Sequence, residues 1–254
     1  MQKEILKTLN QIEAQHNVKI LYACESGSRA WGFPSPDSDY DVRYLYIRPV
    51  EAYLKLFPER DVIEGPIDEI KDFVGWDLQK ALKLLMKGNA PLIEWVRSPI
   101  VYKDNPWLRE NLIKLFNEQS DFNTLYRGYF GLAKNNFKAY LTGESVKPKK
   151  YLHVLRSVLA CEWIKQKKTI PPVLFKEVYE GLLVPGTPFY SEFQELLKIK
   201  AEEKERTTGD HFVAVDKFIN EFFSESKGPL LSSKAPVNVD EYDKFFLECL
   251  RREN

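Results

Sequence analysis

The chain has little of what a secreted, zinc-binding or membrane-spanning protein needs. Its 254 residues include only three cysteines, Cys24, Cys161 and Cys249, too few and too scattered for a disulfide framework or a zinc site. No stretch approaches the roughly 20 apolar residues of a membrane span, and the first residues form an amphipathic pattern in place of a secretion signal. We therefore expect a cytoplasmic protein with buried, reduced thiols and no membrane partner.

The chain also lacks an excess of charge of either sign. Lysine and arginine number 37, as do aspartate and glutamate, which argues against a protein that coats nucleic acid generally. The charge is uneven, however, because residues 121–170 hold ten basic residues against three acidic ones. Such a region suits a polyanionic substrate, although a solvated helical face is the alternative.

The most informative segment is a sharp turn after a buried strand. Residues 18–24 form an apolar run typical of a buried strand, and Glu25-Ser26-Gly27-Ser28 then turns into a predicted short helix. Gly27 would let the backbone approach a ligand closely. The Ser28 hydroxyl and the nearby amides would face phosphate groups, and Arg29 could add a positive charge there.

Two carboxylates follow on the next predicted strand, residues 39–47. Asp39 and Asp41 share one face, because side chains alternate along a strand with a rise of about 3.3 Å per residue. Two such carboxylates can hold a pair of Mg²⁺ ions roughly 3.5 to 4 Å apart, with Mn²⁺ as the alternative metal. Each half alone also fits an ordinary turn or a locally hydrogen-bonded loop. Together, at this spacing, they favour a metal site.

This pattern resembles the DNA polymerase beta nucleotidyltransferase superfamily, whose signature is Gly-Ser, a short helix, and Asp-x-Asp on the next strand. Ser28, Arg29, Gly32, Ser38, Asp39 and Asp41 carry the resemblance. Three more segments are similar to the predicted nucleotidyltransferases called YcgL-like or RNA-ligase-associated, namely Gly75–Leu82, Leu92–Pro99 and Lys149–Arg156. The resemblance implies an α/β (α+β) fold in which a small mixed sheet with flanking helices precedes an all-helical C-terminal domain.

The superfamily also implies a third acid on a neighbouring strand, where it helps hold the metal and can accept the proton of the attacking hydroxyl. Residues 67–74 are the nearby segment that is both strand-like and acidic. We choose Asp72, toward the apolar end, with Asp68 and Asp77 as alternatives. Asp77 also opens a predicted helix over residues 78–87, where it would act as an N-cap.

From about residue 121 the pattern becomes helical. A stripe of apolar residues predicts a helix over residues 126–141, and further helices are expected at 151–167, 175–183, 193–204, 213–223 and 239–251. Residues 224–238, with two prolines, predict a long exposed loop. We therefore expect a nucleotidyltransferase catalytic domain at residues 1–120 and a helical C-terminal domain at residues 121–254.

Three basic residues of the helical half are candidates for nucleotide binding. Lys149, Lys150 and Arg156 cluster over two turns of a predicted helix and fall in a family-like segment. The alternative is that they belong to a solvated helix face. His153, between them, is a weak candidate by itself.

The predicted function is metal-dependent transfer of a nucleoside monophosphate from a nucleoside triphosphate to an acceptor hydroxyl, with release of pyrophosphate. The resemblance implies an RNA end as acceptor; a protein hydroxyl, as in AMP-transferases, and a small molecule such as an aminoglycoside are alternatives. A second hypothesis is a non-catalytic nucleotide- or RNA-binding module that partners an RNA-processing enzyme. A third carboxylate near Asp39 and Asp41 would favour the enzyme.

Overall fold

A computed structural model describes residues 1–65, 70–119, 122–143, 146–202, 211–225 and 237–253. The chain forms two compact units, which we call the sheet unit and the helical unit. The sheet unit comprises Met1–Ala30, Asp39–Ser120 and Lys234–Asn254, and the helical unit comprises Trp31–Ser38 and Asp121–Ser233. A boundary between independently folding domains at residue 120 stays a prediction, since the chain passes between the units at other points as well.

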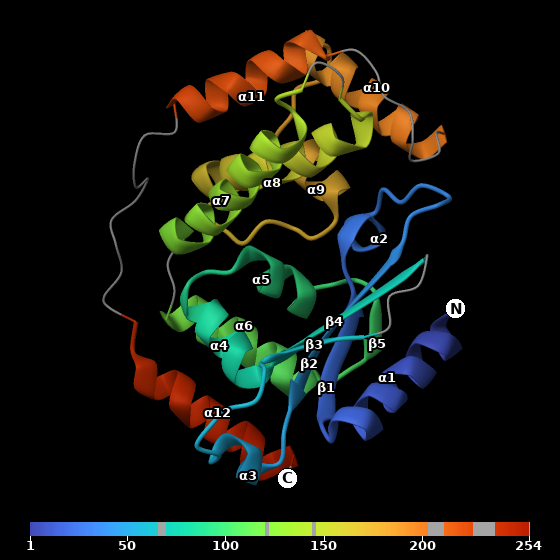
Figure 1. Ribbon diagram of the computed structural model, residues 1–254. Helices are drawn as coiled ribbons and strands as arrows, with labels where there is room; N and C mark the ends of the chain where they lie inside the picture. The colour runs from blue at the N-terminus through green and yellow to red at the C-terminus, as the bar shows by residue number, and fades with distance from the viewer. Residues whose placement is uncertain (66–69, 120–121, 144–145, 203–210, 226–236, 254) are drawn as a thin grey trace. The chain divides into compact units, whose positions relative to one another are not determined.

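A mixed five-stranded sheet lies at the centre of the sheet unit, with the order β3-β4-β2-β1-β5 (Figure 1). The central strands β1 (Lys19–Glu25) and β2 (Tyr40–Ile47) are antiparallel. The strand β4 (Lys71–Asp77) runs parallel to β2, and β3 (Val62–Glu64) and β5 (Val101–Lys103) are antiparallel edge strands. The mixed sheet predicted for this half is confirmed.

Helix α1 (Gln2–His16) covers one face of this sheet. Its apolar stripe is fully buried and belongs to the same core cluster as the inward-facing residues of the central strands. The residues in this cluster are Ile5, Leu9, Ile12, Val18, Ile20, Ala23, Val42, Tyr44, Tyr46, Ile63 and Phe73. Because side chains alternate along a strand, Asp41 and Arg43 of β2 project from the opposite face.

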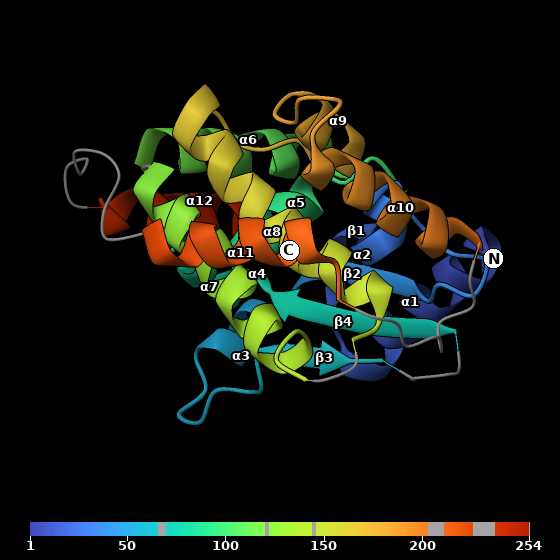
Figure 2. The ribbon, with the colours of Figure 1, turned by 90° about the horizontal axis from the view of Figure 1, so that it is seen from above.

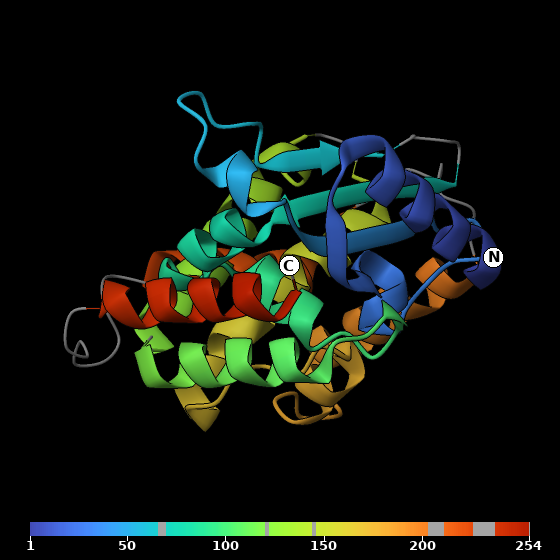
Figure 3. The same ribbon diagram turned by 90° about the horizontal axis from the view of Figure 1, so that it is seen from below.

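The remaining helices of the sheet unit are α3 (Val50–Tyr53), α4 (Leu78–Met86), α5 (Ala90–Val96), α6 (Pro106–Gln119) and α12 (Val239–Glu253). The last of these comes from the end of the chain and packs beside α4 and α6 (Figure 3). Residues far apart in sequence therefore complete the same unit.

The helical unit is built around α8 (Pro148–Lys167), which contacts α7 (Phe122–Tyr140), α9 (Phe175–Glu180), α10 (Pro188–Glu202) and α11 (Val213–Glu225) (Figure 2). The helical character expected after residue 121 is confirmed. Of the loop expected at residues 224–238, residues 226–236 lie outside the described part of the chain.

The structure shows the state of the three cysteines and the character of the helices. Cys24, Cys161 and Cys249 are buried and free. Within the described ranges, no helix is both long enough and apolar enough to cross a bilayer.

The pairing of β2 with β4 depends on a glycine. Tyr44 and Gly75 are register partners, and a Cβ atom on Gly75 would lie 2.0 Å from the Tyr44 ring. The Tyr44 hydroxyl donates a hydrogen bond to the Ile63 carbonyl at 3.0 Å, so the ring cannot move aside freely. Gly75 thus makes room for the aromatic side chain that holds three strands together.

We predict that Gly75→Ala destabilises the protein, because the added methyl group overpacks a core that is already filled. The expected loss in the free energy of unfolding is about 1–3 kcal/mol, measured by denaturant unfolding. Gly131→Ala is the matched control, since a methyl group at this position in α7 would have nothing within 4 Å of it. A Gly75→Ala variant as stable as the Gly131→Ala variant would contradict this account of the pairing.

Candidate active site

The parallel ladder between β2 and β4 brings two of the predicted carboxylates together. Asp41 and Asp72 are register partners, although 31 positions separate them in the sequence. Register partners in a ladder present their side chains on the same face of the sheet. The two carboxylates therefore lie side by side, on the face opposite to α1.

Arg43 binds both carboxylates at once. Its Nη2 donates to Asp41 Oδ1 and to Asp72 Oδ2, each at 2.9 Å. Its Nη1 donates to the carbonyl oxygens of Val42 and Asp72 at 3.1 and 3.0 Å. The guanidinium group thus fixes the geometry of two like-charged groups that would otherwise repel one another.

Asp39 lies one residue before β2 and is exposed. Arg29 holds its backbone: the Arg29 Nε donates to the Asp39 carbonyl at 3.0 Å, and the guanidinium carbon lies 3.8 Å from the Tyr40 ring centroid. The sequence predicts that Arg29 provides a positive charge for phosphate groups. In the structure its side chain also holds the backbone at the start of β2.

The charges of Asp39 and Asp72 both affect the pKa of Asp41. Burial raises the pKa of Asp41, Arg43 opposes this effect, and the charges of Asp72 and Asp39 raise the pKa further. Asp39 and Asp72 are therefore both within electrostatic reach of Asp41. A cation bound here would relieve their mutual repulsion.

The glycine turn lies directly against this group. Gly27 has a φ of +61°, and a Cβ atom at this position would lie 2.0 Å from Asp41 Oδ2. The Ser26 amide also donates to the Asp41 carbonyl at 2.8 Å. Ser28 follows in the short helix α2 (Gly27–Trp31) and is half-buried. The two halves of the sequence motif thus meet in space.

Glu25 is a site residue that sequence reasoning missed. It is fully buried at the end of β1, where its Oε1 accepts a hydrogen bond from the Asp41 amide at 2.6 Å and its Oε2 accepts one from the Tyr102 hydroxyl. Ser98 donates to the Glu25 carbonyl at 2.6 Å. Burial raises the pKa of Glu25, while the Tyr102 and Asp41 hydrogen bonds oppose this effect. The signal in the sequence is an acid that ends an otherwise apolar strand.

The two alternatives for the third carboxylate differ in outcome. Asp68 lies outside the described residues. Asp77 is the N-cap of α4, because its side chain accepts from the Gln79 amide at 2.8 Å and from the Tyr53 hydroxyl at 2.9 Å. Since Asp77 lies five positions beyond Asp72 on β4, it projects from the other face of the sheet. Of the two candidates within the described residues, Asp72 is the one that lies beside Asp41.

The basic candidates belong to the helical unit and gather around His153. Burial, together with the charges of Lys150, Lys200, Lys149 and Arg156, lowers the pKa of His153 to about 3. Lys149 and Lys150 are half-buried, and the Lys150 Nζ lies 4.0 Å from the Tyr140 ring centroid.

Arg156 differs from its neighbours because it is only 4% exposed. Its Nη2 donates to the Val173 carbonyl at 3.1 Å, and its guanidinium carbon lies 4.6 Å from the Trp31 ring centroid. Trp31 in turn packs edge-on against His153. Arg156 therefore packs inside this group of side chains rather than on its surface.

The donor chemistry of the carboxylate site fits a hard divalent cation. Asp39, Asp41 and Asp72 offer oxygen atoms alone, which is the preference of Mg²⁺, and Arg43 neutralises only part of their charge. Across the described ranges, no three His, Cys, Asp or Glu side chains already converge in a geometry that could hold a metal. Metal binding would therefore require these carboxylate side chains to rearrange.

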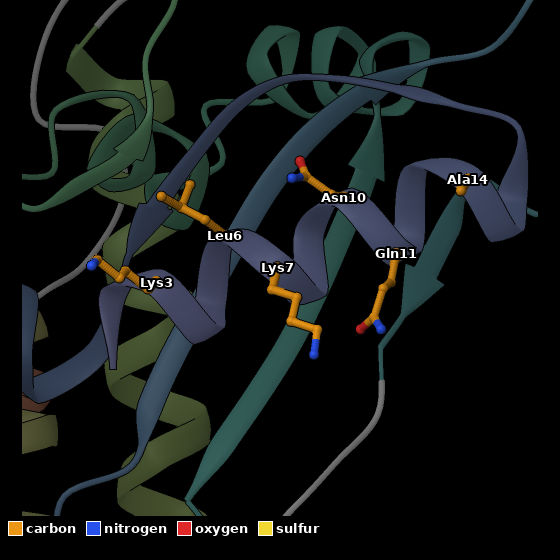
Figure 4. A pocket seen from close by; sticks show the side chains of 6 residues that line it. All are labelled: Lys3, Leu6, Lys7, Asn10, Gln11 and Ala14. Carbon is orange, nitrogen blue, oxygen red and sulfur yellow. The ribbon is translucent and has the colours of Figure 1, made fainter.

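The sheet unit also has a surface hollow on the outer side of α1, with a volume of about 480 Å³ (Figure 4). Its described lining comes from one helix face, with Lys3, Leu6, Lys7, Asn10, Gln11 and Ala14. The lining includes no carboxylate, so this hollow lacks the chemistry of the carboxylate site.

The turn, the paired aspartates and the mixed sheet belong to a nucleotidyltransferase-like protein of the DNA polymerase beta superfamily. The chain is a member of the RlaP family, the RNA repair pathway DNA polymerase beta family, which it matches over residues 1–248. The resemblance seen in the sequence motifs is thus confirmed.

Two relatives and one solved structure are similar to the chain. It is 44% identical over 219 residues to the uncharacterized protein YcgL of Bacillus subtilis, covering 86% of this chain and 84% of that protein. It is 30% identical over 141 residues to the uncharacterized protein MJ0002 of Methanocaldococcus jannaschii, covering 54% and 56%. A nucleotidyltransferase-like protein from Exiguobacterium sibiricum aligns over 98% of this chain and 80% of its own, with 12% identity and a TM-score of 0.31.

We predict that Gly27→Ala damages the site through two effects. The positive φ disfavours a side chain, and the methyl group would collide with the Asp41 carboxylate. Gly186→Ala is the matched control, because Gly186 has a φ of +87° but a methyl group there would have nothing within 4 Å of it. Both variants should lose about 1 kcal/mol of stability because of the positive φ, and Gly27→Ala should lose more because of the collision, as measured by denaturant unfolding. Only Gly27→Ala should also weaken Mn²⁺ binding, measured by electron paramagnetic resonance; equal Mn²⁺ affinity in both would contradict the contact.

A second prediction concerns Arg43. Replacing it with methionine leaves two neighbouring carboxylates without their shared partner, and the Asp72 side chain, 39% exposed, keeps part of its hydration. We expect a loss of about 1–2 kcal/mol in the free energy of unfolding. Millimolar Mg²⁺ should raise the melting temperature of Arg43→Met more than that of the wild type. An equal Mg²⁺ effect on both proteins would argue against a shared cation position.

Proposed function

We propose that this protein transfers a nucleoside monophosphate from a nucleoside triphosphate to a hydroxyl of an RNA end, releasing pyrophosphate. One observation carries the proposal: Asp41 and Asp72 are in register on one sheet face, share Arg43, and lie against the Gly27 turn. An anion-binding turn and clustered carboxylates are the two components that phosphoryl transfer requires.

The proposed roles follow from these positions. Gly27, Ser28 and Arg29 bind the phosphates, and Asp39, Asp41 and Asp72 hold two Mg²⁺ ions, or Mn²⁺ in their place. When bound, such ions activate the attacking oxygen and neutralise the departing phosphates. Glu25 accepts a hydrogen bond from the Asp41 amide and so holds the backbone of Asp41, whose carboxylate lies against the Gly27 turn.

The reaction forms a bond between the acceptor oxygen and the α-phosphorus and breaks the bond from that phosphorus to the bridging oxygen of pyrophosphate. The proton of the acceptor hydroxyl passes to the Asp72 carboxylate, which is the more exposed of the two paired acids. Catalysis then depends on orientation and charge neutralisation rather than on a covalent enzyme intermediate.

Lys149, Lys150 and Arg156 are the proposed nucleotide-binding residues of the helical unit. Lys149 and Lys150 are accessible enough to bind phosphate oxygens, since both are half-buried. Arg156 supports them from the interior through its contact with Trp31. The clustering of four cations around a neutral His153 favours a polyanionic ligand.

Two observations favour this function over its alternatives. The description of the family as part of an RNA repair pathway supports an RNA acceptor over a protein hydroxyl or a small molecule. The presence of Asp72 beside Asp41 supports an enzyme over a non-catalytic nucleotide- or RNA-binding module. The three buried, free cysteines support a cytoplasmic setting, where thiols stay reduced.

We predict that Asp41→Asn and Asp72→Asn each lower transfer by about 100-fold or more, because each loses a charged oxygen at the reacting centre. The assay incubates each α-labelled nucleoside triphosphate with Mg²⁺ and RNA, DNA or no acceptor, and measures label in the acceptor together with pyrophosphate. Asp243→Asn, an exposed acid on α12, is the control and should keep full activity. A double Asp39→Ala, Asp41→Ala variant with wild-type transfer would refute the assignment.

A further inference from the structure

An edge strand of the sheet unit reaches the carboxylate site through hydrogen-bonded side chains. Strand β1 lies between β2 and β5 (Figure 1). Glu25 is the last residue of β1, and Tyr102 is the middle residue of β5. Asp41 lies near the start of β2, so the three residues come from neighbouring strands of one compact unit. Their contacts are therefore described within this unit alone.

The ladder between β1 and β2 ends where the glycine turn begins. The Ser26 amide donates to the Asp41 carbonyl at 2.8 Å, as expected for an antiparallel ladder. The Ser26 carbonyl, which would be the matching acceptor for the Asp41 amide, accepts from the Ala30 amide at 3.5 Å. The Asp41 amide donates to Glu25 Oε1 at 2.6 Å. A side chain thus supplies the acceptor at the point where the backbone turns away.

The Glu25 side chain lies on the sheet face opposite to the paired aspartate side chains. Its register partner, Val42, belongs to the core cluster beneath α1, and register partners point to the same face. Asp41 and Asp72 project from the other face. Glu25 therefore acts on the site through the Asp41 backbone, and not as a further ligand on the carboxylate face.

Hydrogen bonds to two neighbouring residues fix the backbone of Glu25. Its amide donates to the Ile100 carbonyl at 2.9 Å, and its carbonyl accepts from the Ser98 hydroxyl at 2.6 Å. What remains open is the orientation of the side chain. Because Glu25 is fully buried, water does not satisfy its carboxyl group. A donor from the protein must therefore hold the second carboxyl oxygen.

Tyr102 provides this donor. Its hydroxyl donates to Glu25 Oε2, and its ring packs against the core cluster beneath α1. A ring held by close packing gives its hydroxyl a fixed position, and a hydrogen bond away from water is stronger than one in solvent. Tyr102 thus fixes Oε2 and, because the carboxyl group is planar, also the direction of Oε1 toward the Asp41 amide.

The position of the Asp41 backbone matters because its carboxylate has close neighbours. Its Oδ2 would lie 2.0 Å from a Cβ atom placed on Gly27, and its Oδ1 accepts from Arg43 at 2.9 Å. A small shift of the backbone would change both contacts. The hydrogen bond at the Asp41 amide therefore bears directly on the geometry of the carboxylate site.

We propose that Tyr102 and Glu25 form a positioning relay for Asp41: the Tyr102 hydroxyl orients the Glu25 carboxyl group, which holds the Asp41 amide and so sets the place of the Asp41 carboxylate. The inference rests on the proposed function, because Asp41 is one of the carboxylates proposed to hold the divalent ions. Loss of an outer hydrogen bond that orients a metal ligand costs about 10- to 100-fold in metal affinity or activity.

The test compares Tyr102→Phe with a matched variant, Tyr53→Phe. Both tyrosines are half-buried residues of the sheet unit, and each donates to a carboxyl group, since the Tyr53 hydroxyl donates to Asp77 Oδ2 at 2.9 Å. Two further variants separate hydrogen bonding from charge. Glu25→Gln keeps an acceptor for the Asp41 amide without a negative charge, whereas Glu25→Ala removes both.

The first measurement is hydrogen exchange at the Asp41 amide, followed by nuclear magnetic resonance without metal or nucleotide. In Tyr102→Phe this amide should exchange about tenfold faster, because its acceptor is no longer held. The amides of β4 should keep their wild-type rates, and Tyr53→Phe should leave the Asp41 amide unchanged. Unchanged exchange at Asp41 in Tyr102→Phe would overturn the relay, as would equal acceleration in Tyr53→Phe.

The second measurement is Mn²⁺ binding in the presence of a non-hydrolysable nucleoside triphosphate, followed by electron paramagnetic resonance. Tyr102→Phe should bind Mn²⁺ about tenfold more weakly than the wild type, and Tyr53→Phe equally well. Glu25→Ala should lose at least as much, and adding Tyr102→Phe to it should cost nothing more, because the two residues act in series. Glu25→Gln should stay close to the wild type.

The outcomes separate the relay from the proposed function. Wild-type Mn²⁺ affinity in Tyr102→Phe would overturn the positioning role, as would a further loss in the double variant. A loss in Glu25→Gln as large as in Glu25→Ala would show that Glu25 acts through its charge, and would also overturn it. If the wild type itself binds no Mn²⁺, the proposed function fails; faster exchange at Asp41 in Tyr102→Phe would then show that the relay is a structural device alone.

Discussion

The parallel pairing of β2 with β4 is the constraint on which the site depends. It brings together Asp41 and Asp72, and a slip of one residue would turn Asp72 to the face covered by α1. The register is protected on both faces. On one, the Tyr44 ring lies over Gly75; on the other, Arg43 binds both carboxylates and two backbone carbonyls. Apolar packing and an ion pair thus specify the same alignment.

This alignment brings several carboxylates together, and the surrounding protein neutralises only part of their negative charge. The charges of Asp39 and Asp72 act on Asp41, and the buried Glu25, whose pKa is raised by burial, accepts a hydrogen bond from the Asp41 amide. Arg43 compensates part of the charge of Asp41 and Asp72, and Arg29 part of that of Glu25. Charge repulsion of this kind lowers stability, and functional sites keep it because a ligand of opposite sign relieves it. The mutual repulsion of these carboxylates, which lowers stability in the absence of a ligand, would therefore favour the binding of divalent cations.

Sequence reasoning found the parts of this site that are local. The spacing of Gly27, Asp39 and Asp41 identifies the motif, and the apolar periodicity identifies the strands and the helices. It could not find Arg43 or Glu25, because their roles arise from partners across the sheet. The choice among Asp68, Asp72 and Asp77 was likewise open, since parallel pairing joins segments that are far apart in sequence. Lys149, Lys150 and Arg156 look alike in a helical pattern, yet only Arg156 is buried, which packing decides.

The order of elements along the chain also differs from their grouping in space. The sequence changes from strands to helices near residue 120, but α12 packs with α4 and α6, and the segment Trp31–Ser38 packs with α8, α9 and α10. Residues 1–120 alone would leave Trp31 without His153, Phe33 without Phe175 and the Ser35 hydroxyl without its hydrogen bond from Lys200. A fragment of residues 1–120 would also lack α12, so the change of pattern near residue 120 does not mark the boundary of either compact unit.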